Sequence, residues 1–389
     1  MTPLERTYAE AEPGGVDLTV RPARVAATVY RAPTEAPVHT SFGTMTDRPA
    51  VLVEVEDADG ARGWGEIWCN FPTCGAEHRA RLVETVAAPM LIGETFASPV
   101  RAFAEIETRC RVLALQTGED GPLAQMLAGV DIALWDLAAR RTGLPLYRLL
   151  GGEQGAMAAY ASGLNPRGAP EAIARAREGG HTAFKVKTGF GAADLATLAD
   201  AAAALGEGDL LMTDANQAWD FDGATRMTEA LGDLGPAWLE EPIPVDRPKA
   251  EWQLLAQSSP IPLAGGENLR GLAAFQAAAD SGALAVIQPD ACKWGGITGT
   301  LAAARAIRGR GRRYCPHYLG GGIGLSASAH LLAAVGGDGL LEIDVNANPL
   351  RDLLAPELAR VAGDRVELDE VPGLGSEPDL DALADCRVS

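Results

Sequence analysis

A repeated unit in the second half of the chain is the strongest constraint on its fold. After Gly152, short β-like runs recur, and most of them are followed by an Ala-rich segment with helical periodicity. Eight such strands are expected, over residues 158–161, 183–187, 210–214, 237–241, 262–267, 285–290, 313–317 and 340–344. This alternation predicts a parallel sheet with crossover helices.

Polar residues fall at the C-terminal ends of seven of these runs. They are Lys187, Asp214, Glu240, Glu267, Asp290, His317 and Glu342, at intervals of 27, 26, 27, 23, 27 and 25 residues. An α/β unit repeated eight times at this spacing predicts a (β/α)8 TIM-like barrel, whose active site lies at the C-terminal strand ends. An open doubly wound sheet is the competing architecture, but it needs a Gly-rich fingerprint in the first βα turn, which residues 161–166 lack.

The first 150 residues follow a different pattern. Residues 17–68 predict a β-meander interrupted by a loop at Pro33 and Pro37, and residues 75–150 predict helices. Strands followed by helices indicate an α+β domain. We therefore expect an N-terminal α+β domain over residues 1–150, the barrel over 151–353, and a C-terminal segment over 354–389 that folds back on the N-terminal domain.

Composition limits the partners. The 33 Lys and Arg residues face 52 Asp and Glu residues, and the net charge of −19 has the wrong sign for binding nucleic acid. No stretch approaches 18 uninterrupted apolar residues, and residues 1–15 do not resemble a secretory signal. The six cysteines form no CxxC pair, so free thiols are expected. We expect a cytoplasmic protein with no nucleic-acid or membrane partner.

Three carboxylates end three successive predicted strands. Asp214, Glu240 and Glu267 should therefore point into one mouth of the barrel. Any one of them alone could be a helix N-cap or a solvated strand end, but three in succession favour Mg2+, which prefers oxygen ligands. Asn216 and Glu241 are near neighbours and candidate partners of these ligands.

Candidate acid–base groups end the strands on both sides of these carboxylates. Lys185 and Lys187 lie on one face of their strand, where two ammonium groups lower each other's pKa and make a usable base. On the far side, Asp290 can hold and polarise His317 from the adjacent strand end. Glu342, at the last strand end, could donate a hydrogen bond if protonated.

Taken together, these motifs resemble the enolase superfamily and, within it, the mandelate racemase subgroup. The matching segments are Lys185-Val-Lys187, Asp214-Ala-Asn216, Leu239-Glu-Glu-Pro242, Gly266-Glu-Asn268, Pro289-Asp-Ala-Cys-Lys-Trp-Gly-Gly296, His317 and Leu341-Glu342. The resemblance covers nearly the whole chain, because this family also has an N-terminal α+β capping domain and a C-terminal return to it.

The resemblance implies a role for each of these residues. It makes Asp214, Glu240 and Glu267 the Mg2+ ligands. It makes Lys187 the base on one face of the substrate and Lys185 a contact of the substrate carboxylate. It places His317, paired with Asp290, on the other face and implies a hydrogen bond from Glu342 to the carboxylate. Muconate-lactonizing relatives would carry a lysine base where this chain has Asp290, so Lys293, three residues later, is not expected to be that base.

The implied chemistry is abstraction of a proton α to a carboxylate, through an ene-diolate stabilised by Mg2+. Polar loops at residues 37–48 and 68–73 would close over the mouth and favour a polyhydroxylated substrate, since buried hydroxyls need partners. We therefore expect dehydration of an acid sugar to a 2-keto-3-deoxy acid. The alternatives are a racemase or epimerase of a 2-hydroxy or amino acid derivative, and a non-catalytic metal-binding homologue.

Binding of this small carboxylate is expected to involve both the loops and the rim. The candidate substrate-binding residues are His39, Arg48, Asn70 and Asn216. We also expect a homo-oligomer.

Overall fold

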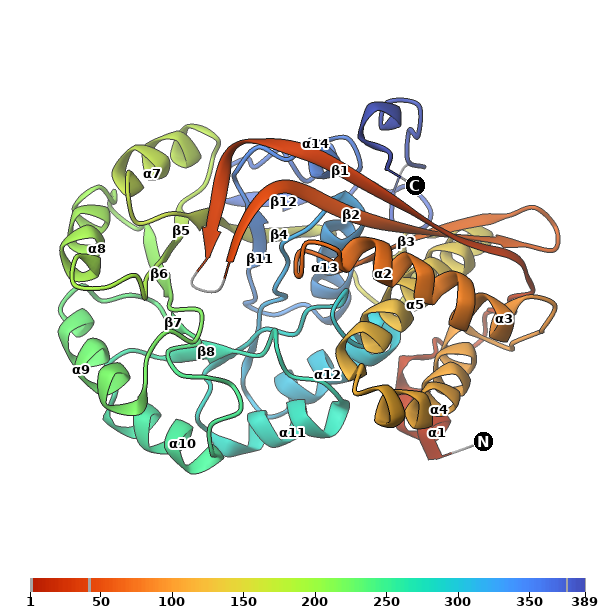
Figure 1. The fold of residues 1–389 in the computed structure, drawn as a ribbon, viewed down its shortest axis with the longest axis horizontal. Coiled ribbons are helices and arrows are strands. Elements are labelled where there is room, and N and C mark those ends of the chain that lie inside the picture. Colours follow the sequence, from red (N-terminus) through yellow and green to blue (C-terminus); the bar gives the residue numbers. More distant parts are fainter. Residues whose placement is uncertain (1–2, 41–42, 376, 389) are drawn as a thin grey trace.

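Eight parallel strands form the centre of the larger half of the molecule (Figure 1). The structure is a computed structural model that describes residues 3–40, 43–375 and 377–388. The strands are β4 (Ala156–Leu164), β5 (Ala183–Lys187), β6 (Leu210–Asp214), β7 (Leu239–Glu240), β8 (Leu263–Gly265), β9 (Val286–Ile287), β10 (Arg313–Tyr314) and β11 (Leu341–Asp344). Hydrogen bonds join them in the order β10-β9-β8-β7-β6-β5-β4-β11, which is barrel order.

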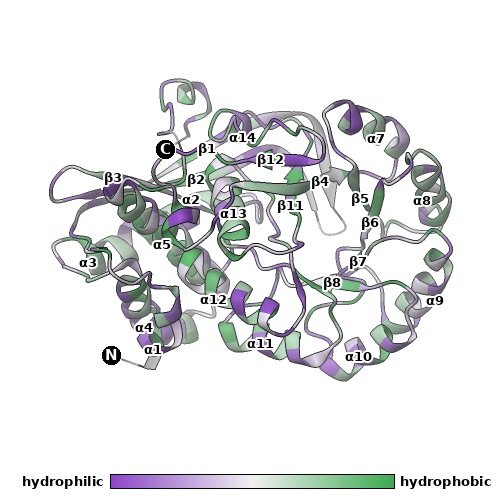
Figure 2. Cartoon of the chain, turned by 180° about the vertical axis from the view of Figure 1, so that it is seen from behind, coloured by the Kyte–Doolittle hydropathy of each residue, from purple (hydrophilic) through white to green (hydrophobic). Residues whose placement is uncertain are grey.

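Helices follow the strands and cover the outside of the barrel. They are α7 (Ala169–Glu178), α8 (Asp194–Ala203), α9 (Phe221–Gly232), α10 (Lys249–Ser258), α11 (Leu272–Ser281), α12 (Gly296–Gly309), α13 (Gly322–Val335) and α14 (Pro349–Asp352). Figure 2 shows apolar colour along β5, β11 and α13 and polar colour on outer helices such as α7. The predicted TIM-like barrel is confirmed, and all eight predicted strands are present, several of them shorter than predicted.

The barrel departs from regularity at its last βα unit. The ladder ends at β10 and β11, which are linked by the 3.4 Å hydrogen bond from Leu340 N to Cys315 Sγ. The helix after β11 has only 4 residues. A further strand, β12 (Arg365–Glu367), pairs antiparallel with β4 instead. After this short helix, the C-terminal segment therefore returns to the start of β4.

The N-terminal half is an antiparallel sheet covered by helices. The sheet has the order β1 (Pro22–Thr40), β2 (Gly43–Asp57) and β3 (Arg62–Ile67). The helical elements are α1 (Pro3–Tyr8), α2 (Gly75–Leu82), α3 (Ala88–Leu91), α4 (Pro99–Thr117), α5 (Asp120–Thr142) and α6 (Leu146–Leu149), with a π turn at Val83–Ala87 and a 3-10 turn at Ala9–Ala11. A further 3-10 turn, Ala384–Cys386, lies in the C-terminal segment. This half is the predicted capping domain.

Helix α5 lies directly on β3 because glycine permits the approach. A Cβ on Gly65 would stand 2.0 Å from the carbonyl oxygen of Gly129, and one on Gly63 would stand 2.2 Å from that of Ala133. No other residue type fits at either position without moving the helix.

The predicted loop at Pro33 and Pro37 is wrong. Strand β1 continues through both prolines and pairs with β2, with a register shift between Pro33 and Val38. An edge strand tolerates proline because its N–H need not donate to a neighbour, and β1 is the edge of its sheet. The result is a long hairpin that extends from the capping domain across the barrel half of the molecule (Figure 1).

Buried carboxylates join the capping domain to the barrel. Glu66 of β3 accepts hydrogen bonds from Gly321 N at 2.6 Å and Gly324 N at 3.0 Å, at the start of α13. Asp131 of α5 accepts from Thr298 N at 2.8 Å and Thr298 Oγ1 at 2.7 Å, in α12. The first N–H groups of a helix have no partner within the helix and need acceptors, so both contacts fix the cap on the barrel.

The C-terminal segment also contacts the cap. Gly373 O accepts from Leu146 N at 2.8 Å, and Val388 N donates to Val29 O at 2.9 Å. The domain boundaries at residues 150 and 353 stay predictions. Within residues 3–40, 43–375 and 377–388, no helix combines the length and apolar character that crossing a membrane requires.

Candidate active site

Three carboxylates stand in a row at the C-terminal ends of adjacent strands. Asp214 ends β6, Glu240 ends β7 and pairs with Asp214 in parallel register, and Glu267 follows β8 by two residues. All three residues are buried. The structure therefore places the three residues that the sequence assigns to a metal at the ends of three adjacent strands.

Each of these carboxylates has a lysine partner. Lys187 Nζ lies 2.5 Å from Asp214 Oδ2, Lys185 Nζ lies 2.7 Å from Glu240 Oε2, and Lys293 Nζ lies 2.6 Å from Glu267 Oε2. Each carboxylate of the row thus forms an ion pair with a lysine through one of its two oxygens, which offsets part of its negative charge.

The pKa values of both lysines are raised and not lowered as the sequence suggested, although Lys185 does act to lower the pKa of Lys187. Burial disfavours the charged form of Lys185, but the carboxylates of Glu240 and Glu342 outweigh it and raise its pKa well above the usual value. For Lys187, burial again acts downward, but Asp214 raises the pKa overall. For Lys187, the effect of the Asp214 carboxylate is larger than that of the second ammonium group.

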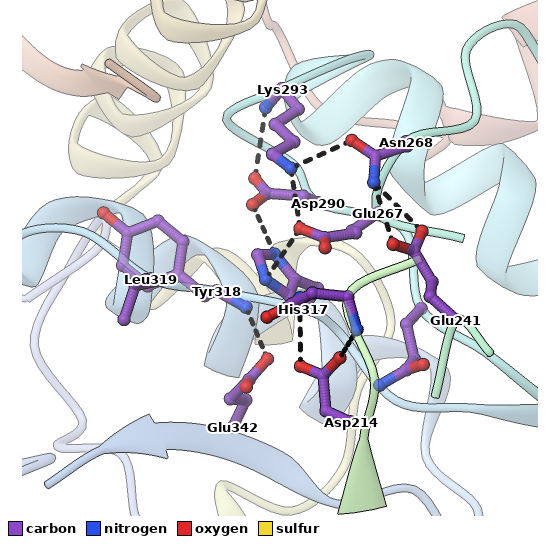
Figure 3. A network of polar contacts seen from close by, with 12 residues as sticks. Asp214, Glu241, Glu267, Asn268, Asp290, Lys293, His317, Tyr318, Leu319 and Glu342 are labelled. Atoms are coloured by element: carbon purple, nitrogen blue, oxygen red, sulfur yellow. Dashed lines mark hydrogen bonds and ion pairs between the residues drawn. The ribbon is translucent and has the colours of Figure 1, made fainter. Parts of the chain in front are cut away.

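His317 lies between two carboxylates, as Figure 3 shows. Its Nδ1 is 2.7 Å from Asp290 Oδ2, and its Nε2 is 2.9 Å from Glu267 Oε2. Asp290 is itself held by Cys292 N at 2.8 Å and Lys293 N at 3.1 Å, both to Oδ1. Burial alone would lower the pKa of His317, but these carboxylates and Glu342 raise it well above its usual value, which favours the protonated ring.

Glu342 is ionised, in contrast to the protonated donor considered from the sequence. Its Oε1 accepts from Ser162 Oγ at 2.5 Å and contacts Lys185 Nζ at 2.7 Å, and its Oε2 accepts from Tyr318 N at 3.0 Å. Burial would raise the pKa of Glu342, but Lys185 and His317 lower it to about 2. It acts here as an anchor for Lys185.

The four predicted substrate-binding residues lie in different settings. Arg48 is buried, with Nη2 2.7 Å from Asp344 Oδ2 at the end of β11. Asn70 Nδ2 donates to Leu319 O at 2.8 Å, and Asn216 Oδ1 accepts from Lys187 Nζ at 2.9 Å. The side chain of His39 lies outside the described residues. Of the three whose side chains are described, Asn216 is the one that contacts a candidate acid–base group directly.

Comparison with known families matches both halves of this chain. The "Mandelate racemase / muconate lactonizing enzyme, N-terminal domain" matches residues 24–151, and "Enolase C-terminal domain-like" matches residues 169–382. The chain belongs to the mandelate racemase/muconate lactonizing enzyme family. It is thus a member of the enolase superfamily.

Solved and curated members of the family resemble the chain over most of its length. A mandelate racemase/muconate lactonizing enzyme from Bordetella bronchiseptica RB50 is 55% identical, with a TM-score of 0.89 over 95% of this chain and 99% of that one. D-galactarolactone cycloisomerase from Agrobacterium fabrum is 32% identical over 91% of this chain and 95% of its own.

A mutant L-talarate/galactarate dehydratase, liganded with Mg and L-glucarate, is 26% identical, with a TM-score of 0.80 over 94% of this chain and 91% of that one. Distant homologues thus include acid-sugar dehydratases and cycloisomerases.

The donor set of this family member suits Mg2+. Among the described residues no three His, Cys, Asp or Glu side chains are grouped as a metal cage, and a lysine contacts each of the three carboxylates. Glu240 Oε1, however, is buried and has no hydrogen-bond partner. Burial, with Asp214 beside it, raises the pKa of Glu240 to about 7. Either a proton or a cation can satisfy a buried carboxylate oxygen that has no partner, so this oxygen fits a Mg2+ ligand.

Several polar groups of the site were assigned no role from the sequence. Ser162 lies in β4, one residue beyond the predicted end of that strand. Gln288 Nε2 donates to Glu240 Oε2 at 2.8 Å, and its position two residues before Asp290 was the available signal. Asn268 Nδ2 donates to both oxygens of Glu241, at 3.0 and 3.1 Å. Lys293 was rejected as a base, and its contact with Glu267 had no sequence signal.

Proposed function

We propose that this protein is a Mg2+-dependent acid-sugar dehydratase that forms a 2-keto-3-deoxy acid through an ene-diolate. The observation that carries the proposal is the placement of two proton-transfer groups at opposite ends of one carboxylate row. Lys187 contacts Asp214 at one end, and His317 contacts Glu267 at the other. A substrate carboxylate over the row would have one such group on each side of its α-carbon.

The residues divide the reaction between them. Asp214, Glu240 and Glu267 would hold Mg2+, which supplies positive charge that stabilises the ene-diolate and offsets the carboxylates that raise the lysine pKa values. Lys187 takes the α-proton, and the electron pair moves into the carboxylate. Lys185, fixed by Glu342, offers a buried positive charge to that carboxylate.

His317 completes the elimination. Its raised pKa makes it a proton donor at neutral pH, and its Nε2 is the atom that faces away from Asp290. The ene-diolate re-forms its carbonyl, the bond from the β-carbon to its oxygen breaks, and the proton from Nε2 goes to that oxygen. Water leaves, and the enol product tautomerises to the 2-keto acid.

Ring opening is the second candidate, favoured by the similarity to a D-galactarolactone cycloisomerase. If the β-oxygen belongs to a ring, the same elimination opens the ring and gives an isomer instead of releasing water. Racemisation or epimerisation requires only that the ene-diolate be reprotonated from the His317 side. A non-catalytic metal-binding homologue is disfavoured because both proton-transfer groups are in place.

One experiment separates these outcomes. The protein with Mg2+ is incubated in deuterated water with a library of acid sugars and their lactones, and products are analysed by NMR, semicarbazide and mass spectrometry. Dehydration gives a 2-keto acid that has lost one water. Ring opening gives a 2-keto acid that has lost no water and has gained only deuterium from the solvent. An epimer labelled with α-deuterium, without any keto acid, would contradict both eliminations.

A further inference from the structure

Lys293 is a third lysine in the active site, and no role in the reaction has been assigned to it. The sequence contains only four lysines among its 33 Lys and Arg residues, at positions 185, 187, 249 and 293. Three of the four contact the carboxylate row. Because a lysine is a compact point charge and an arginine is a planar fork, the use of lysine in so arginine-rich a chain indicates that position 293 requires an ammonium group.

The contacts of Lys293 differ from those of the other two lysines. Lys185 has a second carboxylate, Glu342, at 2.7 Å, so it keeps a charged partner if Glu240 turns away. Lys293 Nζ has Glu267 Oε2 at 2.6 Å as its one ion pair among the described residues. Its other neighbours are Asn268 Oδ1 at 3.4 Å and the ring of Trp68, whose centroid is 4.6 Å away.

Glu267 contacts both Lys293 and His317. Its Oε2 faces both Lys293 and His317 (Figure 3), and it is also one of the three carboxylates proposed to hold Mg2+. The ammonium group and a metal ion require the same carboxylate, and their positive charges repel each other at this range. Binding of one therefore weakens binding of the other.

Trp68 connects this competition to the capping domain. It directly follows β3, its backbone N donates to Cys292 O at 3.3 Å, and its ring lies against the Lys293 ammonium group. The face of an indole ring attracts a cation electrostatically, so a movement of the Lys293 ammonium group changes the surroundings of the Trp68 ring directly. Residues 68–73 form one of the loops expected to close over the mouth.

We propose that Lys293 is a positioning residue whose ammonium group competes with Mg2+ for the carboxylate of Glu267. Trp68, which contacts that ammonium group, transmits the replacement of Lys293 by Mg2+ to the capping domain. The inference rests on the proposed metal site but not on the reaction that follows. In the metal-free protein Lys293 holds Glu267 and Trp68 together. When Mg2+ takes Glu267, the ammonium group loses its ion pair and its contact with the indole changes.

Calorimetric titration of Mg2+ into the metal-free protein tests the competition. We expect Lys293→Met to lower the Kd for Mg2+ about tenfold, because a hydrogen bond to a charged group no longer opposes the metal. Lys293→Arg keeps the charge and should bind Mg2+ no more tightly than the unsubstituted protein. Lys249→Met is the matched control, since Lys249 is exposed at the start of α10, and it should leave the Kd unchanged.

Tryptophan emission tests the connection to the cap. The difference between the unsubstituted protein and Trp68→Phe isolates the signal of Trp68 among the seven tryptophans. We expect Mg2+ to change this difference signal, and Lys293→Met to abolish the change while Mg2+ still binds. If Lys293→Met fails to fold, as judged by circular dichroism, Lys293→Gln replaces it.

The outcomes separate this inference from the proposed function. An unchanged Kd in Lys293→Met, or a Mg2+ response of Trp68 that survives it, overturns the role of Lys293 alone. Failure of the unsubstituted protein to bind Mg2+ overturns the metal site and this inference together. Absence of a 2-keto acid, with the Kd and emission effects intact, overturns only the proposed reaction.

Discussion

The barrel rim and the capping domain both bury charged side chains, but they satisfy them differently. On the rim, ammonium and carboxylate groups meet in pairs, such as Lys185 with Glu240. In the cap, buried carboxylates accept backbone N–H groups of the barrel, as Glu66 does from Gly321. Ion pairs can exchange partners when a substrate or cation arrives, whereas contacts to backbone groups hold two parts in one arrangement. The rim is therefore built for chemistry and the cap for attachment.

Removing the imidazole should produce the largest effect and test whether the rim alone carries the chemistry. We expect His317→Asn to reduce formation of 2-keto acid by about 10⁴-fold, the upper range for loss of a general acid. Lys187, which contacts Asp214 at the other end of the row, should still exchange the α-proton for deuterium. NMR and semicarbazide assays measure the two steps separately.

The result would contradict the assigned roles if elimination survived or if exchange stopped with it. Lys187→Ala serves as the reciprocal variant, in which exchange itself should be lost.

The second prediction concerns the one buried ion pair that links the hairpin to the barrel among the described residues. Arg48→Met leaves Asp344 buried without its guanidinium, and we expect a loss of about 3 kcal/mol in the free energy of unfolding. Urea denaturation measures this loss. The double variant Arg48→Met/Asp344→Leu should recover most of it, because an apolar pair replaces an ion pair at little cost.

If Arg48→Met instead retains its stability and raises only KM, Arg48 contacts substrate, as the sequence analysis expected, and the attachment role is wrong.

The third prediction tests the metal site on the rim. Glu240 has one buried oxygen without a partner, so we expect Glu240→Gln to raise the Kd for Mg2+ about 100-fold, at the upper end of what loss of a metal-site partner costs. Calorimetric titration measures the Kd. Glu251→Gln, at a partly exposed carboxylate of α10, is the control. Unchanged Mg2+ affinity in Glu240→Gln would remove Glu240 from the ligand set.

The same contrast explains how much could be predicted from the sequence. The bounds of β5 and β6 and the row of Asp214, Glu240 and Glu267 follow from strand periodicity, because parallel strands deliver their end residues to one rim. Contacts between the capping domain and the barrel cannot be predicted from the periodicity of either segment. The pairing of Arg48 with Asp344 joins residues 296 apart, and that of Lys293 with Trp68 depends on how two domains dock.

The ionisation states of the site residues were the property that the sequence predicted least well. Two lysines on one strand face suggested lowered pKa values, but carboxylates from neighbouring strands raise both pKa values overall. The alternation of residues in a strand predicts on which face a side chain lies, but it does not predict which charged groups of other strands lie nearest to it.

The smallest expected effect tests attachment of the cap through a neutral histidine. His330 of α13 is buried, its Nδ1 accepts from Tyr147 N at 3.0 Å in α6, and its ring N–H donates to the backbone of Leu374. Only the neutral ring can accept and donate in this way, and burial lowers the pKa of His330 from 6.5 to about 3. This one ring therefore joins the barrel, the cap and the C-terminal segment.

The sign of the pH dependence follows from that shift. Between pH 6.5 and 3 the unfolded chain binds a proton at His330 that the folded protein does not, so the stabilisation is complete above pH 6.5 and is lost as the pH falls. At about 1.4 kcal/mol per pH unit below pH 6.5, we expect His330 to lower the free energy of unfolding at pH 5 by about 2 kcal/mol relative to pH 7. His330→Gln can keep the bond from Tyr147 and should show a shallower loss in urea denaturation between these pH values. His78→Gln, at a half-exposed histidine, should keep the original slope, and an equal slope in His330→Gln would show that the ring does not titrate between the two states.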